Sequence, residues 1–345
     1  MLRDELARRF PRLILLPPDS FVVGGAVRDL LQGIDPADVD VACNDPLVCA
    51  RLISKRPIRL GTQEHLSAWR VVDGEHVYDF AEVLDHDIEA DLARRDFTID
   101  AMAVRLGDGE LLDRHGGRSD LERHLVRMIA AENFDDDPLR CLKCVRLAVV
   151  QGFNVDPQTI AAIRPRAPRI TKVAAERVTF ELSLIFSAGA FRRALELLQA
   201  TALDVPLFGH EPGEFHADEI SVAGAYALLV NDPKHYAKRW RWSSDLRRDV
   251  VALKHLVARH DVVALYDAGE HVARQLPAVL RALGRNDLLV MPDFSTRALL
   301  RGEEIGLPEG PELGRVKRAL LEAQIRGEVT TEEEARRFLG RIPSS

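Results

Sequence analysis

The chain has 345 residues, of which 46% are hydrophobic, and its formal net charge is −7. This length suits two or more packed domains, and the acidic balance excludes a globally basic surface, so any surface for RNA must be local. No apolar run reaches the length of a membrane span and the N-terminus has no signal-peptide core, so we expect a soluble, cytoplasmic protein.

Residues 21–41 predict a short strand, a glycine turn, a helix and a second strand that carries two carboxylates. Gly24 and Gly25 let a ligand approach the backbone closely, and the helix that starts there favours a phosphate. Asp38 and Asp40 point to one face of their strand and repel each other unless a cation such as Mg²⁺ lies between them. The pattern predicts metal-assisted nucleotidyl transfer, against the alternative of a glycine turn followed by a solvated acidic loop.

A hairpin turn at Asp73-Gly74 precedes a predicted strand over residues 76–83. On this strand Asp79 faces away from Tyr78 and Phe80, so it can join the first two carboxylates. An acid exposed on an edge strand explains Asp79 equally well.

Arg94, Arg95 and Asp96 follow one another after a short acidic stretch. Guanidinium groups suit the oxygens of a triphosphate, and a carboxylate can accept a hydrogen bond from a ribose hydroxyl. For this triplet in isolation, an exposed arginine–aspartate pair on a helix is the simpler explanation.

Residues 135–153 predict a helix that starts at Pro138 and carries Asp137 and Arg140 on one face. Cytosine and adenine both present an amino donor beside a ring-nitrogen acceptor. A carboxylate and a guanidinium can therefore read these two bases and reject guanine and uracil. An ordinary ion pair on a solvated face is the alternative.

Beyond residue 154 the pattern is helical. Two basic stretches, 164–177 and 234–248, suit contacts with RNA or, equally well, solvated and packed helix faces. The pair Cys141 and Cys144 lies within a helical pattern without a second such pair, which favours reduced cysteines over a zinc site. The residues at which we predict RNA contacts are Arg164, Arg166, Arg169, Lys172, Lys238, Arg239 and Arg241.

Five segments, in the same order, resemble motifs of the class II tRNA nucleotidyltransferases and the related bacterial poly(A) polymerases, within the polymerase-β nucleotidyltransferase superfamily. These segments are GGAVRDLL with DVDV, RRDFTIDAMA, LLDRHGGRSDL, DDDPLRCLKC and TKVAAERV. The resemblance implies an α+β fold, in which a polymerase-β-like head with a small mixed sheet precedes an all-helical neck, body and tail. We place the catalytic head, base-recognising neck, body and tRNA-binding tail at residues 1–130, 131–190, 191–270 and 271–345.

The resemblance also implies roles for single residues. Asp38 and Asp40 hold Mg²⁺, and Asp79 acts with them in catalysis. The implied activity is template-free addition of cytidines, as CC or complete CCA, to a tRNA 3′ end from CTP and ATP. It involves no membrane and no obligate protein partner. The implied nucleotide-binding residues are Gly24, Gly25, Arg28, Arg95, Asp96, Asp137, Arg140 and Lys143.

Three substitutions and one short segment depart from the family pattern. Asp100 stands where the family usually has Asn, and Asp136 and Lys143 replace Glu and Arg in the fourth motif. Only VLDHDIEADLA separates the strand of Asp79 from Arg94, where the family inserts a longer polar loop that helps to switch from C to A addition. Members with a shortened loop tend to add only the two cytidines, so the resemblance favours CC addition.

Two other functions are alternatives. A poly(A) polymerase would use the same chemistry, but the acidic net charge, the missing basic tail and the short loop speak against it. A catalytically silent RNA-binding relative is an alternative of a different class. It would have no physical reason to keep Asp38 and Asp40 facing each other.

Overall fold

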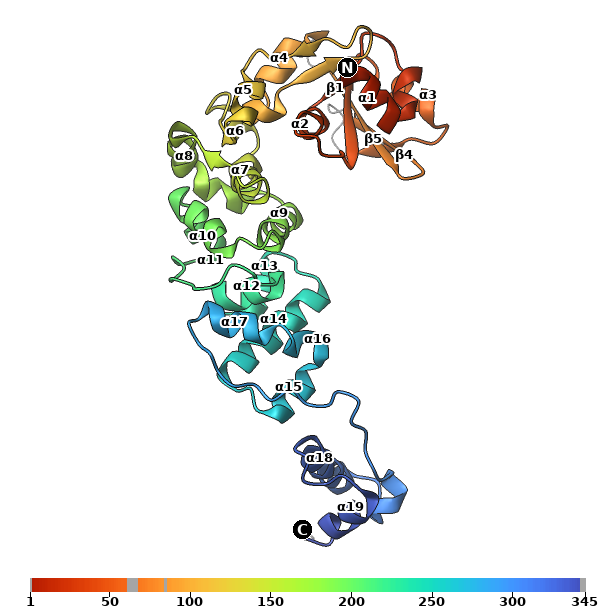
Figure 1. Ribbon diagram of the computed structural model, residues 1–345, viewed down its shortest axis with the longest axis vertical. Coiled ribbons are helices and arrows are strands. Elements are labelled where there is room, and N and C mark those ends of the chain that lie inside the picture. The colour runs from red at the N-terminus through yellow and green to blue at the C-terminus, as the bar shows by residue number, and fades with distance from the viewer. Residues whose placement is uncertain (1, 61–67, 84–85, 342–345) are drawn as a thin grey trace. The chain divides into compact units, whose positions relative to one another are not determined.

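The computed structural model describes residues 2–60, 68–83 and 86–341. Its N-terminal part is built on a seven-stranded sheet with the strand order β3-β4-β5-β2-β1-β6-β7 (Figure 1). Neighbouring strands pair antiparallel except β2 and β5, which are parallel, so the sheet is mixed as the resemblance implies. The strands are β1 Phe21–Val23, β2 Asp38–Cys43, β3 Ile58–Leu60, β4 Ala68–Asp73, β5 His76–Glu82, β6 Ala103–Arg105 and β7 Leu111–Leu112.

One face of the central strand β2 is polar where the strand begins, and the opposite face is apolar. Val39 and Val41 are buried, whereas Asp38 and Asp40, which alternate with them, are exposed. Ala42, two residues beyond Asp40, is buried again. The face that carries the carboxylates is therefore acidic where β2 begins and apolar where β2 ends.

The apolar end of this face is covered by the segment that follows β5. Ala42 packs in one cluster with Val23, Ala103 and Leu92, and Leu92 lies on helix α4. Helices α3 and α4 each begin at an aspartate whose side chain accepts a hydrogen bond from the backbone, which explains where these helices start. The head helices are α1 Leu2–Arg9, η1 Pro11–Leu15, α2 Gly25–Leu31, α3 Pro46–Ile53, α4 Ile88–Ala93, η3 Thr98–Asp100 and α5 Gly117–Glu122.

The rest of the described chain is helical, as expected, with one exception. The two-residue strands β8 (Leu125–Val126) and β9 (Asn154–Val155) pair in parallel, a contact between distant segments that local periodicity does not reveal. The remaining helices are α6 Asn133–Asp136, α7 Leu139–Val150, α8 Pro157–Ile163, η4 Arg164–Lys172, α9 Ala175–Ser187, α10 Phe191–Ala200, α11 Asp204–Phe208, α12 Val222–Leu229, α13 Pro233–Arg239, α14 Ser244–Ala258, α15 Val262–Ala268, α16 Glu270–Ala273, α17 Leu276–Ala282, η5 Gly302–Ile305, α18 Pro311–Ile325 and α19 Glu332–Leu339.

The chain forms two compact units. One comprises the residues up to Glu181 together with Glu196–His210, and the other comprises Leu182–Leu195 together with the residues from Glu211 onward. The finer division into head, neck, body and tail remains a prediction. The sheet and the helices up to α8 belong to the first unit, so the predicted catalytic and base-reading residues all lie there.

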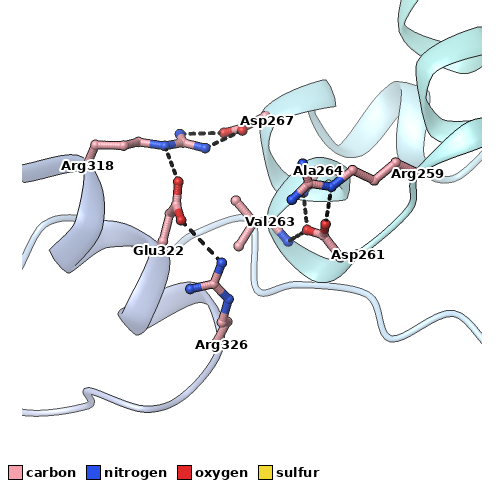
Figure 2. Close-up of polar contacts among 8 residues, drawn as sticks. All are labelled: Arg259, Asp261, Val263, Ala264, Asp267, Arg318, Glu322 and Arg326. Carbon is pink, nitrogen blue, oxygen red and sulfur yellow. Dashed lines mark hydrogen bonds and ion pairs between the residues drawn. The ribbon is translucent and has the colours of Figure 1, made fainter. Parts of the chain in front are cut away.

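Within the second unit, α18 packs against α15. Figure 2 shows Arg318 of α18 in a two-pronged ion pair with Asp267 of α15, where Nη1 lies 2.7 Å from Oδ1 and Nη2 contacts Oδ2. The Nε group of Arg318 donates to Glu322 at 2.8 Å, and Glu322 also accepts from Arg326 at 3.2 Å. A chain of charged contacts therefore joins the two helices.

Candidate active site

The sheet brings the three predicted acidic residues of the head together. In the parallel register of β2 with β5, Asp40 lies opposite Asp79, and Asp38 lies opposite Val77. Residues opposite each other in neighbouring strands point to the same face. Asp40 and Asp79 are therefore neighbours on the face that also carries Asp38.

Asp40 lies in an unbalanced electrostatic environment. Loss of hydration raises the pKa of its carboxyl group to about 6, with further contributions from the negative charges of Asp38, Asp79 and Asp100, although Arg95 opposes the rise. The residue nevertheless remains accessible to solvent. A divalent cation at this position would relieve the repulsion among the carboxylates.

Asp79 is bound by an arginine that the sequence analysis did not single out. Arg70 on β4 lies opposite Asp79 in the antiparallel pairing of β4 with β5. Its Nε donates to Oδ1 at 2.7 Å and its Nη2 donates to Oδ2 at 2.6 Å. The predicted turn at Asp73-Gly74 could have identified Arg70 as the partner of Asp79. The turn pairs Asp73 with His76, and this register places Arg70 opposite Asp79.

Gly24 keeps the space between Arg95 and Asp40 open. Its φ of +73° lies in the region that favours glycine. A Cβ here would lie 2.9 Å from Nη1 of Arg95 and 3.7 Å from Oδ2 of Asp40. Any side chain would displace the arginine, so this position suits a phosphate group that approaches both the guanidinium and the carboxylate.

Arg28 is buried and lies between two acids. Its Nη1 donates to Oδ1 of Asp100 at 2.5 Å, and its Nε and Nη2 donate to Oδ1 of Asp29 at 2.9 and 2.8 Å. Asp100, which replaces the Asn usual in the resembled family, thus supplies a second negative partner to this guanidinium. Gly25 lies against it, because a Cβ there would be 3.4 Å from Nη2 of Arg28.

Arg95 and Asp96 follow the end of α4. Arg95 donates to the carbonyl of Asp100 at 3.4 Å and, through Nη2, to Asp91 at 3.3 Å. Asp96 accepts a hydrogen bond from the N–H of Phe97 at 3.0 Å. These contacts fix the backbone of the second motif beside Gly24.

Asp96 lies within electrostatic reach of the base-reading helix. Burial raises the pKa of Asp96, as does the charge of Asp100, while the positive charges of Lys143 and Arg140 oppose the rise. Lys143 and Arg140 both lie on α7. The residues predicted to contact the ribose and the base are therefore within electrostatic reach of one another.

Arg140 lies on the first turn of α7, whereas Asp137 precedes this helix in an extended conformation, with φ −142° and ψ 100°. The prediction that one helix carries both residues on one face is therefore wrong, because the chain becomes helical only after Asp137. Asp137 accepts from the N–H of Leu139 at 3.1 Å and from Nη2 of Arg177 on α9 at 2.7 Å. Partial burial tends to raise the pKa of Asp137, but Arg177 outweighs it and the pKa is lowered. Arg140 donates to the backbone carbonyl of Arg94 at 2.9 Å. Arg177 is a second residue that the sequence analysis did not single out for the site, although it lies in the fifth motif.

The predicted RNA-binding arginines of η4 have partners within the protein. Arg166 donates to Asp135 at 3.0 and 2.9 Å, and Arg169 pairs with the same carboxylate. Arg164 donates to a backbone carbonyl at 2.6 Å. Lys172, at the end of η4, is exposed. RNA contacts at these positions remain a prediction.

The second basic stretch has exposed cations and buried rings. Lys238 and Arg241 are exposed, and Arg239 lies over the ring of Trp240 at 4.7 Å from its centroid. Trp240 and Trp242 are buried. The aromatic rings therefore pack the helices, which leaves only the basic side chains for the predicted RNA contacts.

Asp38 and Asp40 are the residues that suit a divalent cation. They supply hard oxygen ligands on one face, and the pKa of Asp40 is raised by loss of hydration and by the neighbouring carboxylates. Within the described ranges, no three His, Cys, Asp or Glu side chains are close enough to hold a metal ion, and Cys141 and Cys144 are buried free thiols. A cation at Asp38 and Asp40 would therefore need further oxygen ligands, which nucleotide phosphates can supply.

Two segments of the chain match known families. Residues 20–127 match the poly A polymerase head domain, and residues 152–211 match the probable RNA and SrmB-binding site of polymerase A. The A-adding tRNA nucleotidyltransferase of Deinococcus radiodurans is 32% identical over 97% of this chain and 98% of its own length. The CC-adding tRNA nucleotidyltransferase of Thermus thermophilus is 30% identical over 94% of this chain and 93% of its own length.

Solved structures of CCA-adding enzymes share the fold. The Thermotoga maritima enzyme in complex with tRNA has a TM-score of 0.70 at 21% identity, covering 96% of this chain and 94% of that one. The Bacillus stearothermophilus enzyme in complex with CTP has a TM-score of 0.71 at 22% identity, covering 96% and 97%. The predicted α+β fold, with a mixed sheet followed by helices, is thereby confirmed. Among the described helices, none has the length and apolar character needed to cross a membrane.

Proposed function

This chain belongs to the family of tRNA nucleotidyltransferases, and from that premise we propose that it adds the two cytidines of the CCA end to tRNA without a nucleic-acid template. It is an enzyme of the nucleotidyltransferase class. The observation that carries the proposal for its site is the convergence of Asp38, Asp40 and Asp79 beside the open space at Gly24. We propose a cytoplasmic location, because tRNA, its proposed substrate, is processed in the cytoplasm.

Nucleotidyltransferases of this family generally use a divalent metal, and we propose Mg²⁺ held by Asp38 and Asp40. When bound, Mg²⁺ would lower the pKa of the RNA 3′ hydroxyl and neutralise charge on the triphosphate. These two residues fit that role because they are oxygen donors on one strand face with uncompensated charge.

The remaining residues position the reactants for a direct transfer. The 3′ oxygen of the RNA forms a bond to the α-phosphorus of CTP as the bond to the β-phosphate breaks and pyrophosphate leaves. Arg95 lies next to the space above Gly24, where its guanidinium can bind phosphate oxygens. Asp96 can accept a hydrogen bond from the ribose, and Arg28 with Asp100 holds the turn at Gly25 in place. No covalent enzyme intermediate is needed.

The nucleotide base is read by protein side chains. The carboxylate of Asp137 can accept from the exocyclic amino group, and the guanidinium of Arg140 can donate to the ring nitrogen. Arg140 lies on the first turn of α7 and Asp137 just before this helix, and the contact of Asp137 with Arg177 orients the carboxylate. Such a pair admits cytosine and adenine but leaves guanine and uracil with unmatched donors and acceptors.

The short connection after β5 favours cytidine addition. Only residues 83–87 lie between β5 and α4, which leaves little chain to rearrange for a change from cytosine to adenine. A addition is the second candidate, because the A-adding Deinococcus relative is 32% identical over nearly the whole chain.

A primer-extension assay tests the proposal. The purified chain would receive Mg²⁺ and tRNA that lacks its CCA end, with CTP, ATP or both, in parallel with tRNA that already ends in CC. Growth by two residues with CTP, and no third residue with ATP, is the expected result. Addition of a single adenosine, and only to the tRNA that ends in CC, would indicate an A-adding enzyme. Addition of a long adenosine tail would indicate a poly(A) polymerase. No incorporation in any lane would contradict the enzymatic function.

A further inference from the structure

Arg70 lies in one row with the carboxylates of the site. In this row across adjacent strands, Arg70 is opposite Asp79, and Asp79 is opposite Asp40. Opposite residues share a face of the sheet, so the guanidinium lies on the face of the proposed metal site. The pKa of Arg70 is raised, first by its hydrogen bonds to Asp79 and also by the charges of Asp38 and Asp40, which are therefore within electrostatic reach.

The guanidinium occupies both oxygens of Asp79. The two N–O distances of 2.7 and 2.6 Å describe a two-pronged pair in which each carboxylate oxygen accepts one N–H. The side chain of Asp79 is 18% exposed and that of Arg70 is 41% exposed, so the guanidinium is the more exposed member of the pair. A cation bound at Asp38 and Asp40 cannot use the same lone pairs while Arg70 holds them.

Holding the hairpin together does not explain this pair. The strands β4 and β5 are already joined over six residue pairs from Ala68 to Asp73, and Arg12 binds Asp73 at the turn end with a distance of 2.7 Å. A partly exposed ion pair adds little to stability. The pair instead determines how much negative charge and how many ligands the site offers, because Arg70 cancels one of three neighbouring carboxylates.

We propose that Arg70 is a positioning residue that withholds Asp79 from the metal in the free enzyme, so that the resting site binds its cation through Asp38 and Asp40 alone. The inference rests on the proposed function, since it assumes a metal at these two residues. Phosphate oxygens are the other partners that a guanidinium fork binds well. A phosphate of the arriving reactants therefore competes for Arg70 and releases Asp79 only when the substrates are in place.

The test measures metal ligation directly and without turnover. Mn²⁺ would be titrated into the full-length protein without nucleotide, and its affinity and number of bound waters determined by electron paramagnetic resonance and water-proton relaxation. Arg70→Gln frees Asp79, so we expect Mn²⁺ to bind at least about tenfold more tightly and to lose one water ligand. Arg70→Gln with Asp79→Asn keeps the net charge of the site. This double variant should match the wild type in affinity, within about twofold, and in water count.

Other outcomes would overturn the inference. If the charge-balanced double variant bound Mn²⁺ about tenfold more weakly and with one water more, Asp79 would be a ligand despite Arg70. If Arg70→Gln bound more tightly but kept its water count, Arg70 would act through its charge alone. No binding by the wild type, with or without CTP, would refute the metal assignment itself and this inference with it.

Two controls separate these results from damage to the fold. Arg12→Gln removes the arginine–aspartate pair at the other end of the same hairpin and should leave Mn²⁺ binding unchanged. Arg70→Lys keeps the charge but lacks the planar fork, so it should release Asp79 in part and bind Mn²⁺ with an affinity between those of the wild type and Arg70→Gln. Circular dichroism would show whether each variant folds.

Discussion

At the scale of single residues, the environment of Asp40 disfavours the ionised form of its carboxyl group. Its carboxyl group titrates near pH 6 in the folded protein, above the ordinary value of 3.8. Between these values the folded state binds a proton more tightly than the unfolded chain does. The ionised carboxylate therefore destabilises the fold. The penalty is absent below about pH 4 and complete above about pH 6.

Asp40→Asn should therefore stabilise the metal-free protein while it abolishes nucleotide incorporation. At pH 7.5 with a chelator, we expect the free energy of unfolding to rise by about 1 kcal/mol, a value reduced for the solvent exposure of the group. Urea denaturation at several pH values would measure it, and the gain should shrink as the pH falls from 6 to 4. A variant less stable than the wild type at pH 7.5 would contradict this account.

A second prediction at this scale concerns Asp100. Asp100→Asn restores the residue usual in the family but removes one of two negative partners of buried Arg28. We expect a loss of about 1–2 kcal/mol in the free energy of unfolding, limited because Asp29 remains bound to Arg28. Asp108→Asn is the matched control, since Asp108 is exposed, pairs with half-buried Arg105 and should matter little. Equal effects of the two variants would argue against the role of Asp100.

At the scale of elements, the proposed base-reading pair involves two helices. Arg140 lies on the first turn of α7 and Asp137 just before it, and the carboxylate of Asp137 accepts a hydrogen bond from Arg177 of α9. Arg177 and Asp137 are 40 positions apart in the chain. We therefore expect α9 to contribute to nucleotide choice through this contact, without touching the base.

Arg177→Gln should relax base choice more than it weakens RNA binding. Without its partner the Asp137 carboxylate can rotate, so we expect the preference for CTP over UTP to fall about tenfold, as kcat/KM with each nucleotide would show. Arg169→Gln is a suitable control, because Arg169 is similarly exposed and also binds an aspartate, Asp135. If the two variants discriminate equally well, orientation of Asp137 by Arg177 is not required.

At the scale of the whole molecule, the chain forms two compact units. The first holds Asp38, Asp40 and Asp79 and the residues that we propose bind the nucleotide and its base. In the second, helices α18 and α19 have their own small core, which includes Leu300, Leu320 and Ala335. The contact of Arg318 with Asp267 links these helices to α15 (Figure 2). The chain between α17 and η5, residues 283–301, connects the same parts covalently.

Arg318→Gln should loosen this link without unfolding the protein. Both partners are more than 40% exposed, so we expect the free energy of unfolding to change by less than about 1 kcal/mol. Local opening should nevertheless speed proteolysis within residues 283–301 several-fold, which timed digestion would measure. Arg326→Gln, which removes a contact to Glu322 alone, should leave the cleavage rate unchanged. Equal rates for the wild type and Arg318→Gln would show that α18 is held by its apolar contacts.

The sequence by itself determined the local geometry of the site. Alternation along β2 placed Asp38 and Asp40 on one face, and Pro138 marked the start of α7, which carries Arg140 on its first turn. Such features depend on repeats of two to four residues, which are visible in a single segment. Helical spacing failed for Asp137, which precedes this helix in an extended conformation. The order of the motifs then indicated the family, which the comparisons confirm.

Only the tertiary structure decided which partner each charged residue has. Arg28 meets Asp100 from 72 positions away, and Asp137 meets Arg177 from another helix. In the basic stretch 234–248, for which the sequence left RNA contacts and helix packing equally open, Trp240 is buried. Partners across segments depend on how elements pack, and periodicity carries no information about packing. Arg70 is the intermediate case, because a short turn fixes its position opposite Asp79, while the two-pronged bond that occupies this carboxylate is a property of the folded sheet.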